Sequence, residues 1–243
     1  MKVSRNELTA TLKKAFEGLG FSVGDYQDAA AMIIWSQMHG FDGLQQLQDA
    51  LPFLNDCLCL HAKLIHNDDH QALLDGQGSS VLLSGSQTVR LACALARQYG
   101  SSRVRLDNCH NRRLIIQRLA SAAASHSALV AYWVEGTTAI KVSIGPGAKR
   151  PDYGRYVVQD AVADQSLLIF AGADLASIDQ QFNDEIALGI QTEAYSWDAM
   201  VDRYDIMLDE GIEIDESLWY ELDTLVARVL VESTDSSRAG AGD

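Results

Sequence analysis

Long apolar runs are missing from this 243-residue chain, and proline occurs only three times. No run approaches the roughly 20 apolar residues that a membrane-spanning helix requires. The first five residues lead into a polar helical pattern and lack the apolar core of a secretory signal. We therefore expect a cytoplasmic protein with no membrane partner.

Basic residues are scarce in the last third of the chain. Residues 1–159 carry 16 Lys and Arg against 13 Asp and Glu, a balance of +3, whereas residues 160–243 carry 3 against 20, a balance of −17. Because binding to phosphate backbones needs surplus basic charge, we expect no nucleic-acid partner. The acidic third is interpreted as a solvated face that aids solubility. Docking on a basic partner, or on the chain's own basic segment, stays open.

Cysteine is scarce too, and its spacing does not predict a metal or redox site. The Cys57-x-Cys59 pair is too tight for the usual zinc or redox motifs, and Cys93 and Cys109 are isolated. Cys93 falls in an apolar helical pattern and is interpreted as a small buried side chain. We expect reduced thiols.

One short segment is rich in histidine and aspartate, namely His61, His66 and His70 with Asp68 and Asp69. Its spacing fits no strong metal-ligand pattern. The polar stretch is typical of a turn between two strands. We adopt the solvated turn and expect no metal, with the metal cluster as the alternative.

Helical periodicity is strongest at the two ends of the chain. Ser4 and Glu7 form a capping box in front of the first helix, and Gly18 and Gly20 end it. A third helix starts at Gly43 and is bent at Pro52. The other predicted helices are 25–38, 86–99, 113–124, 180–190, 194–208 and 216–232.

The middle of the chain alternates between strand and helix patterns. The β-rich runs 128–135 and 138–144 predict a hairpin at Gly136. Segment 149–156 is basic and is interpreted as irregular. The remaining predicted strands are 62–65, 72–74, 81–83, 103–106 and 166–170.

These patterns predict the α/β class, with a mixed sheet and helical layers from the N- and C-terminal segments. We expect one intertwined unit over residues 1–232. It comprises an N-terminal helical part (1–60), a mixed α/β part (61–172) and acidic C-terminal helices (173–232). Residues 233–243 are expected to form a flexible tail.

Several motifs, taken in order, resemble the malate/L-lactate dehydrogenase type-2 family. The helix that starts at Val3-Ser4-Arg5 is followed by Gly20-Phe21-Ser22, and the next helix ends at His39-Gly40-Phe41-Asp42-Gly43. Further on, Ala94-Leu95-Ala96-Arg97-x-x-Gly100 precedes a strand and Asn108-Cys109-His110. The resemblance covers about residues 1–145, and a second, weaker similarity covers residues 211–222.

The resemblance implies a nicotinamide cofactor, NAD(P), on a fold distinct from the Rossmann fold, small 2-keto acids or related imines as substrates, and a homodimer. Departures from the family motifs imply a divergent, truncated relative, of an uncharacterised bacterial type. The family's Ser-His before the glycine is missing between Asp42 and Gly43, His39 replaces its arginine, and its Gly-Thr-Asn-Pro segment is missing. Loss of a general acid typically costs about 10²- to 10⁴-fold in rate.

His39 is the first candidate catalytic residue. It ends a helix, where the helix dipole favours the cationic imidazole, and Asp42 is close enough in sequence to orient it. The alternative is a capping histidine without chemistry.

His110, Arg112 and Arg113 are the best candidates for a ligand site. They begin a predicted helix after a strand that carries Arg103 and Arg105, and backbone N–H groups with arginines suit a phosphate or carboxylate. His110 is also a candidate catalytic residue. The alternative is that these arginines, with Arg118, pair with the acidic third.

Two weaker candidates are a glycine turn and the C-terminal tail. Gly145 and Gly147 are predicted to bind cofactor, although the turn lacks the pattern of a P-loop and fits a plain loop. Residues 233–242 resemble the family's own tail and would form either a lid or a loose terminus.

Two functions follow from these predictions. The first is a non-catalytic or weakly catalytic protein that binds a small anion or nucleotide, or a partner, on a 2-keto-acid reductase scaffold. The alternative is a divergent NAD(P)-dependent oxidoreductase of small 2-keto or 2-hydroxy acids. The missing Ser-His pair favours the first.

Overall fold

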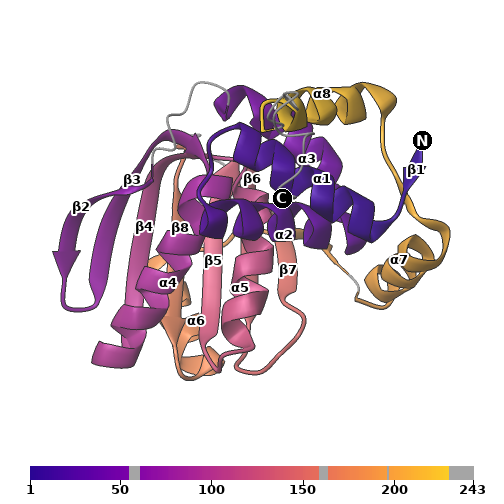
Figure 1. Ribbon diagram of the computed structural model, residues 1–243. Coiled ribbons are helices and arrows are strands. Elements are labelled where there is room, and N and C mark those ends of the chain that lie inside the picture. The colour runs from indigo at the N-terminus through magenta and orange to yellow at the C-terminus, as the bar shows by residue number, and fades with distance from the viewer. Residues whose placement is uncertain (55–60, 159–163, 196, 230–243) are drawn as a thin grey trace.

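The computed structural model describes residues 1–54, 61–158, 164–195 and 197–229, and it is built around one mixed sheet (Figure 1). The strand order is β2-β3-β4-β8-β5-β6-β7-β9. The strands are β2 (Lys63–Asp68), β3 (Gln71–Ser80), β4 (Ser101–His110), β5 (Ala128–Glu135), β6 (Thr138–Ile144), β7 (Asp152–Val157), β8 (Leu167–Gly172) and β9 (Gln191–Ala194). The predicted α/β class with a mixed sheet is confirmed.

Only β3 and β4 pair in parallel, and every other neighbouring pair of the sheet is antiparallel. Since parallel neighbours need a crossover, a helix connects them, α4 (Val81–Tyr99). The predicted hairpins are both present, β2 with β3 and β5 with β6. The central strand β8 has all six residues buried, because helices cover both of its faces.

Helices from both ends of the chain cover the sheet. α2 (Val23–Met38), α4 and α5 (Ile116–Ala123) lie on one face, and α6 (Leu175–Glu185) lies on the other (Figure 1). α1 (Arg5–Gly18), α3 (Gly43–Ala50) and α8 (Glu216–Ala227) form an outer layer, with α7 (Trp197–Glu210) to one side.

The two ends are joined by a small sheet of β1 (Lys2–Val3) and β10 (Ile212–Glu213). The amino group of Met1 donates to the carbonyl of Ile214 at 2.9 Å. The predicted helical layers from both termini are therefore confirmed.

The link between α2 and α3 is tight and depends on backbone conformation. Gly40 has φ +80° and Asp42 has φ +49°, both in the left-handed region. A Cβ at Gly43 would collide with the carbonyl oxygen of Ile33 and lie 2.6 Å from the backbone nitrogen of Gln37. Only glycine lets α3 start this close to α2, and the same link fixes His39 as the C-cap of α2.

Several predicted boundaries are wrong. Residues 81–83 form the first turn of α4, because the hydroxyl of Ser80 accepts the N–H of Leu82 and caps the helix there. Segment 149–156, expected to be irregular, contains β7, whose register against β6 is continuous. Similarly, α6 ends at Glu185, and residues 191–194 form the edge strand β9.

Some predictions concern residues that the structure does not describe, and others concern the absence of a membrane span or a metal site. Cys57, Cys59 and the 233–243 tail lie outside them. Cys93 and Cys109 are both buried free thiols, so the interpretation of Cys93 is confirmed. Within the described ranges, no helix is long and apolar enough to span a bilayer, and no cluster of three potential metal-ligating side chains is found.

Candidate functional site

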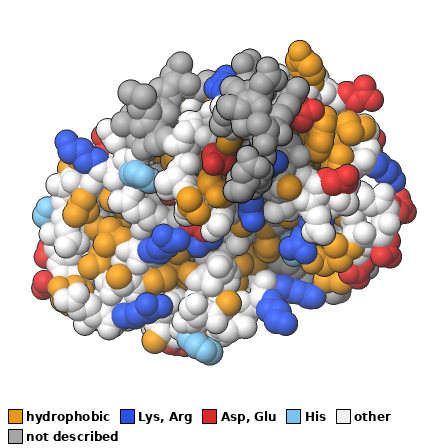
Figure 2. Space-filling model, viewed as in Figure 1, with side chains coloured by type: hydrophobic (Ala, Val, Ile, Leu, Met, Phe, Trp, Pro, Cys, Tyr) orange, Lys and Arg blue, Asp and Glu red, His pale blue; other side chains and the backbone are white. Residues whose placement is uncertain are grey.

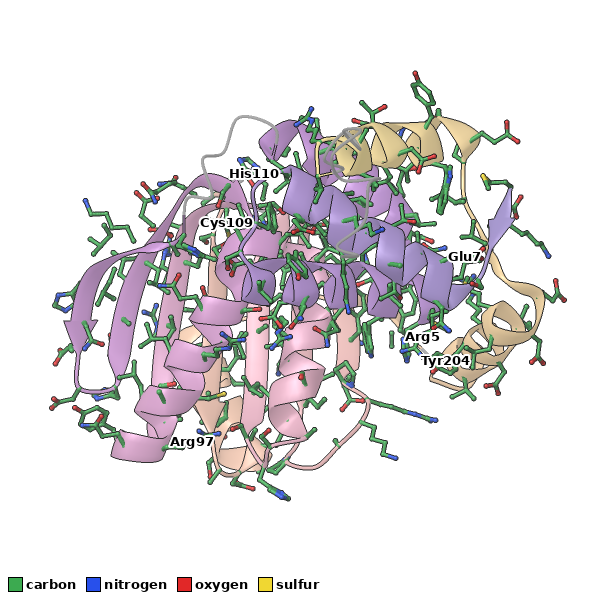
Figure 3. The ribbon with its side chains drawn as sticks, in the orientation of Figure 1. Arg5, Glu7, Arg97, Cys109, His110 and Tyr204 are labelled. Carbon is green, nitrogen blue, oxygen red and sulfur yellow. The ribbon has the colours of Figure 1, made fainter. Side chains whose placement is uncertain are left out.

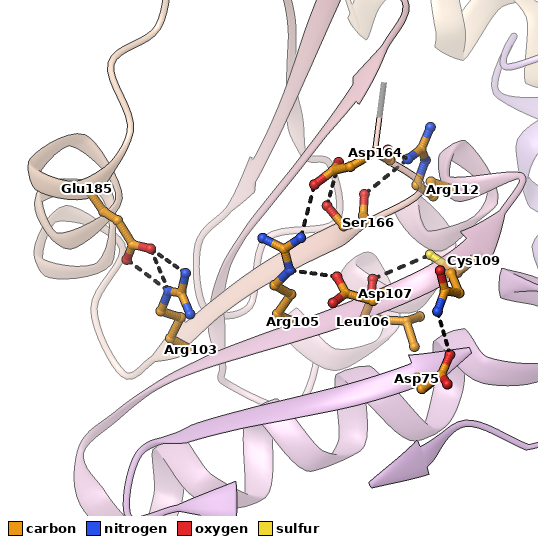
Figure 4. A network of polar contacts seen from close by, with 11 residues as sticks. Asp75, Arg103, Arg105, Leu106, Asp107, Cys109, Arg112, Asp164, Ser166 and Glu185 are labelled. Atoms are coloured by element: carbon orange, nitrogen blue, oxygen red, sulfur yellow. Dashed lines mark hydrogen bonds and ion pairs between the residues drawn. The ribbon is translucent and has the colours of Figure 1, made fainter. Parts of the chain in front are cut away.

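Arg112 is buried and serves the fold. It begins a short 3₁₀ helix, Arg112–Ile115, and α5 follows only at Ile116, so the α-helix expected from residue 113 starts later. Its guanidinium donates to three backbone carbonyls, those of Asp164 at 2.6 Å, Ser166 at 3.2 Å and Val134 at 3.0 Å (Figure 4 shows the contacts to residues 164 and 166). These contacts tie the ends of three segments together and use three of the five N–H donors of the guanidinium.

The neighbouring arginines are paired as well. Arg103 forms an ion pair with Glu185, and Arg105 pairs with Asp107 and Asp164 (Figure 4). The alternative prediction, in which the arginines pair with the acidic third, therefore holds for Arg103 and Arg105, which contact Glu185 and Asp164. Arg113 and Arg118 pair with carboxylates outside the acidic third, with Glu135 at 3.2 Å and Asp28 at 2.9 Å respectively.

His110 lies near Arg112 and packs against an aromatic ring. Its ring stacks on Phe53 with centroids 4.0 Å apart, and burial and the charge of Arg112 both lower its pKa. The glycine turn lies elsewhere, after β6. There the N–H of Gly147 donates to the carbonyl of Ala123 at 2.8 Å, so this donor caps α5 and does not face a ligand.

His39 lies at the wall of a cleft. Its Nδ1 is 2.7 Å from the carbonyl oxygen of Trp35, and its ring stacks on the Trp35 indole. Burial lowers the pKa of His39, the hydrogen bond to Trp35 opposes this, and Arg150 lowers it further. Burial therefore outweighs the effect of the helix dipole, from which a favoured cationic form of His39 was predicted. Asp42 lines a different cavity, beside Gln37 and Glu213.

The cleft has a volume of about 650 Å³ and lies between α1, α2 and α7. Arg5, Thr9 and Lys13 lie along α1 at helical spacing and face it together. Figure 3 shows Arg5 and Tyr204 at the same end of the molecule. The other wall residues are Gln27, Ala30, Ala31, Ile34, Trp35, Met38, His39 and Gln117.

A second cavity of about 230 Å³ adjoins the first at His39 and Tyr204. Lys149 and Arg150 line it. Arg5, Lys13 and Lys149 form no ion pair with any side chain that the structure describes. The joint cleft thus combines aromatic rings with cations, in a chain that is acidic overall.

Basic side chains are also visible at the surface. Figure 2 shows Lys and Arg across the middle of one face, whereas many Asp and Glu side chains lie towards the edge where α7 and α8 are drawn. The surface potential therefore changes sign across this face, which favours the approach of anions to its middle.

Aromatic residues connect the cleft to the interior. Phe41 is buried and stacks on Trp35, Tyr153 and Tyr195, with centroids 5.2 to 5.8 Å apart. Burial raises the pKa of Tyr153 to about 12. Arg113 also lies near this cluster: burial acts to lower the pKa of its guanidinium, and Tyr153 and Glu135 raise it by more.

Sequence reasoning missed Tyr204, Arg5 and Lys13. Tyr204 approaches His39 with ring centroids 5.3 Å apart, although 165 positions separate them. The helical spacing of Arg5 and Lys13 was visible, but nothing in the sequence showed that α7 would cover that face of α1 and α2.

Comparison with known proteins establishes the fold. A family model described as a protein of unknown function (DUF3726) matches residues 3–87. None of the curated proteins compared with the chain matches it.

Several solved structures share the architecture. An Escherichia coli protein provisionally assigned as a malate/lactate dehydrogenase is 11% identical, with TM-score 0.66 over 98% of each chain. Malate dehydrogenase from Pyrococcus horikoshii is 13% identical, with TM-score 0.63 over 96% of each chain. Sulfolactate dehydrogenase from Methanocaldococcus jannaschii is 12% identical, with TM-score 0.64 over 94% of this chain and 97% of its own. At these identities the likeness shows the fold alone.

Proposed function

We propose that this chain is a divergent relative of the malate/L-lactate dehydrogenase type-2 proteins that binds a small anion or nucleotide and has little or no catalytic activity. The observation that carries the proposal is the joint cleft at His39, where Arg5, Lys13 and Lys149, which form no ion pair with a described side chain, lie with the aromatic rings of Trp35 and Tyr204. We therefore propose the site at His39, in preference to Arg112 and Arg113, which the sequence favoured.

The size and chemistry of the cleft support this assignment. A volume of about 650 Å³ falls within the range of roughly 300–1,000 Å³ found for small-molecule and cofactor sites. Arg5 and Lys13 would neutralise phosphate or carboxylate groups. Trp35 and Tyr204, both half-buried in the wall of the cleft, would contact a flat ring, and aromatic pairs of this kind contribute about 0.5–1.5 kcal/mol beyond burial.

The tight link at Gly43 supports a loss of catalysis. The resemblance places the family's acid–base histidine between Asp42 and Gly43, and this chain passes directly from Asp42 to Gly43, where α3 starts against the backbone of Ile33. His39 is the nearest substitute. However, a lowered pKa keeps its imidazole neutral near pH 7, so it would be a poor proton donor to a carbonyl oxygen.

A divergent NAD(P)-dependent oxidoreductase is the second candidate, favoured by a fold shared with dehydrogenases and with the Δ1-piperideine-2-carboxylate reductase of Pseudomonas syringae. A reduced nicotinamide, when bound, supplies a hydride. The cleft residues fit such a group, because Arg5, Lys13 and Lys149 would hold its phosphates and Trp35 would border a ring.

Thermal unfolding with a ligand panel tests the proposal. NADH, NADPH, pyruvate and oxaloacetate would each be added at millimolar concentration at constant ionic strength. A ligand at 100 times its dissociation constant stabilises the native state by about 2.7 kcal/mol. A shift with at least one probe is expected, without turnover. Turnover with NADH or NADPH would favour the oxidoreductase, and no shift with any probe would contradict an anion-binding cleft.

A further inference from the structure

A separate groove of about 240 Å³ lies between α4 and α5. Residues 86, 90, 93 and 97 of α4 are spaced by four, three and four, so they share one face of that helix. The opposite wall of the groove comes from α5 and the turn that follows it, and consists of residues 118, 121, 122 and 125. The groove residues used below are Ser86, Arg90, Arg97 and Arg118.

The groove contains more positive charge than its surroundings balance. The nearby carboxylate of Asp28 is shared, because its Oδ2 accepts from Arg90 at 2.8 Å and its Oδ1 accepts from Arg118 at 2.9 Å. Arg97 forms no ion pair with a described side chain. Three guanidinium groups and one carboxylate leave a net charge of about +2 in one groove.

Two buried polar groups in the groove also lack partners. Ser86 is only 7% exposed, and its hydroxyl is inaccessible to solvent and makes no hydrogen bond to a described residue. The Nε of Arg118 is in the same situation. Buried polar groups are normally hydrogen-bonded, so these two donors are unusual features of this helix pair, and the charge of the three arginines carries the inference of an anionic ligand.

We propose that this groove binds a phosphate group, either free phosphate or a phosphate monoester. Its volume lies below the roughly 300 Å³ at which sites for cofactor-sized ligands begin, so the ligand is small or only its phosphate enters. Arginine forks match the oxygens of such an anion in pairs. Arg97 is the residue free to turn towards it, at the open end of the groove near the C-terminus of α4 (Figure 3).

The groove is distinct from the cleft at His39. The two share no lining residue, although Gln117 faces the cleft and Arg118 faces the groove from adjacent positions on α5. A phosphate group held here would therefore occupy a second site, and each site can be tested without disturbing the other.

Calorimetric titration of the full chain tests the groove. The probes are inorganic phosphate and glycerol 3-phosphate, each titrated at fixed ionic strength into the wild type, R97Q and R228Q. Arg97 is exposed, so R97Q is expected to fold, and Arg228 is an exposed arginine at the C-cap of α8 that serves as the matched control. We expect R97Q to weaken phosphate binding about tenfold or more and R228Q to leave it unchanged.

The two probes separate the sources of the phosphate group. Tighter binding of glycerol 3-phosphate indicates a monoester, whereas equal or tighter binding of inorganic phosphate indicates the free ion. Absence of binding by both probes at millimolar concentration would overturn the proposal. So would equal affinities in the wild type and R97Q. A variant of the cleft, K13Q, should keep phosphate binding, so failure of one site does not imply failure of the other.

Discussion

The imidazole of His39 stacks on the indole of Trp35, with centroids 4.2 Å apart and ring planes inclined by 19°. Residues four apart share one face of a helix, so α2 itself brings the two rings together at its last turn. Tyr204 approaches the same imidazole from α7. The cleft therefore has an aromatic wall that one helix provides and a second helix completes.

Burial of His39 makes stability depend on pH. The folded protein resists protonation of this imidazole, because its pKa lies below the ordinary 6.5, whereas the unfolded chain takes up the proton near 6.5. The free energy of unfolding should therefore fall as the pH drops through this value. Urea denaturation should show that H39Q loses less stability than the wild type between about pH 7.5 and about pH 5.5. Equal losses would contradict the burial of the imidazole.

Gly43 should not tolerate a side chain. In G43A the new methyl group would meet the backbone of Ile33 and Gln37, so α3 has to shift away from α2. We expect a destabilisation of about 3 kcal/mol, measured by urea denaturation. Gly24 is the matched control, because a Cβ there meets nothing within 4 Å. G24A should be neutral or stabilise by up to about 1 kcal/mol. Equal effects of both variants would refute the close approach.

Arg112 should matter for stability and not for ligand binding. R112M removes the donors to the carbonyls of Asp164, Ser166 and Val134, and buried acceptors without partners are costly. Chemical denaturation should show a loss of about 3 kcal/mol. R103Q, which breaks the surface ion pair with Glu185, should cost less than about 1 kcal/mol. Loss of anion binding in R112M at a temperature where it remains folded would restore the site that the sequence predicted.

Asp28 should oppose anion binding while stabilising the fold. D28N removes the counter-charge of Arg118, whose side chain is only 15% exposed, and should destabilise the protein by about 1–3 kcal/mol. Phosphate should then raise the melting temperature of D28N more than that of the wild type, because the freed arginines gain a new partner. A smaller rise in D28N would show that the groove arginines do not bind phosphate.

Much of the fold could be predicted from local signals in the sequence. The capping box at Ser4 and Glu7 is present, because it depends on residues three apart. The hairpin of β5 and β6 was predicted because both strands are β-rich and a glycine joins them. β9 was missed because it is a fully exposed edge strand of four residues, with no apolar alternation to mark it.

The candidate site was harder to predict, because its residues meet only in the tertiary structure. His39 was predicted, since a histidine at a helix end beside a glycine is visible in the sequence. Arg112 was interpreted as a ligand-binding residue because the sequence does not reveal that carbonyls of distant segments surround its guanidinium. Similarly, the charge of the α4–α5 groove depends on Asp28, which lies 62 positions before Arg90.

Calorimetric titration of NADH and NADPH into the wild type, K13Q and K14Q tests the binding cleft most directly. Lys13 lines the cleft, whereas Lys14 is exposed on the other side of α1 and is the matched control. We predict binding that weakens about tenfold in K13Q and is unchanged in K14Q. Equal affinities in all three proteins would contradict it, as would the absence of binding by NADH, NADPH, pyruvate and oxaloacetate alike at millimolar concentration.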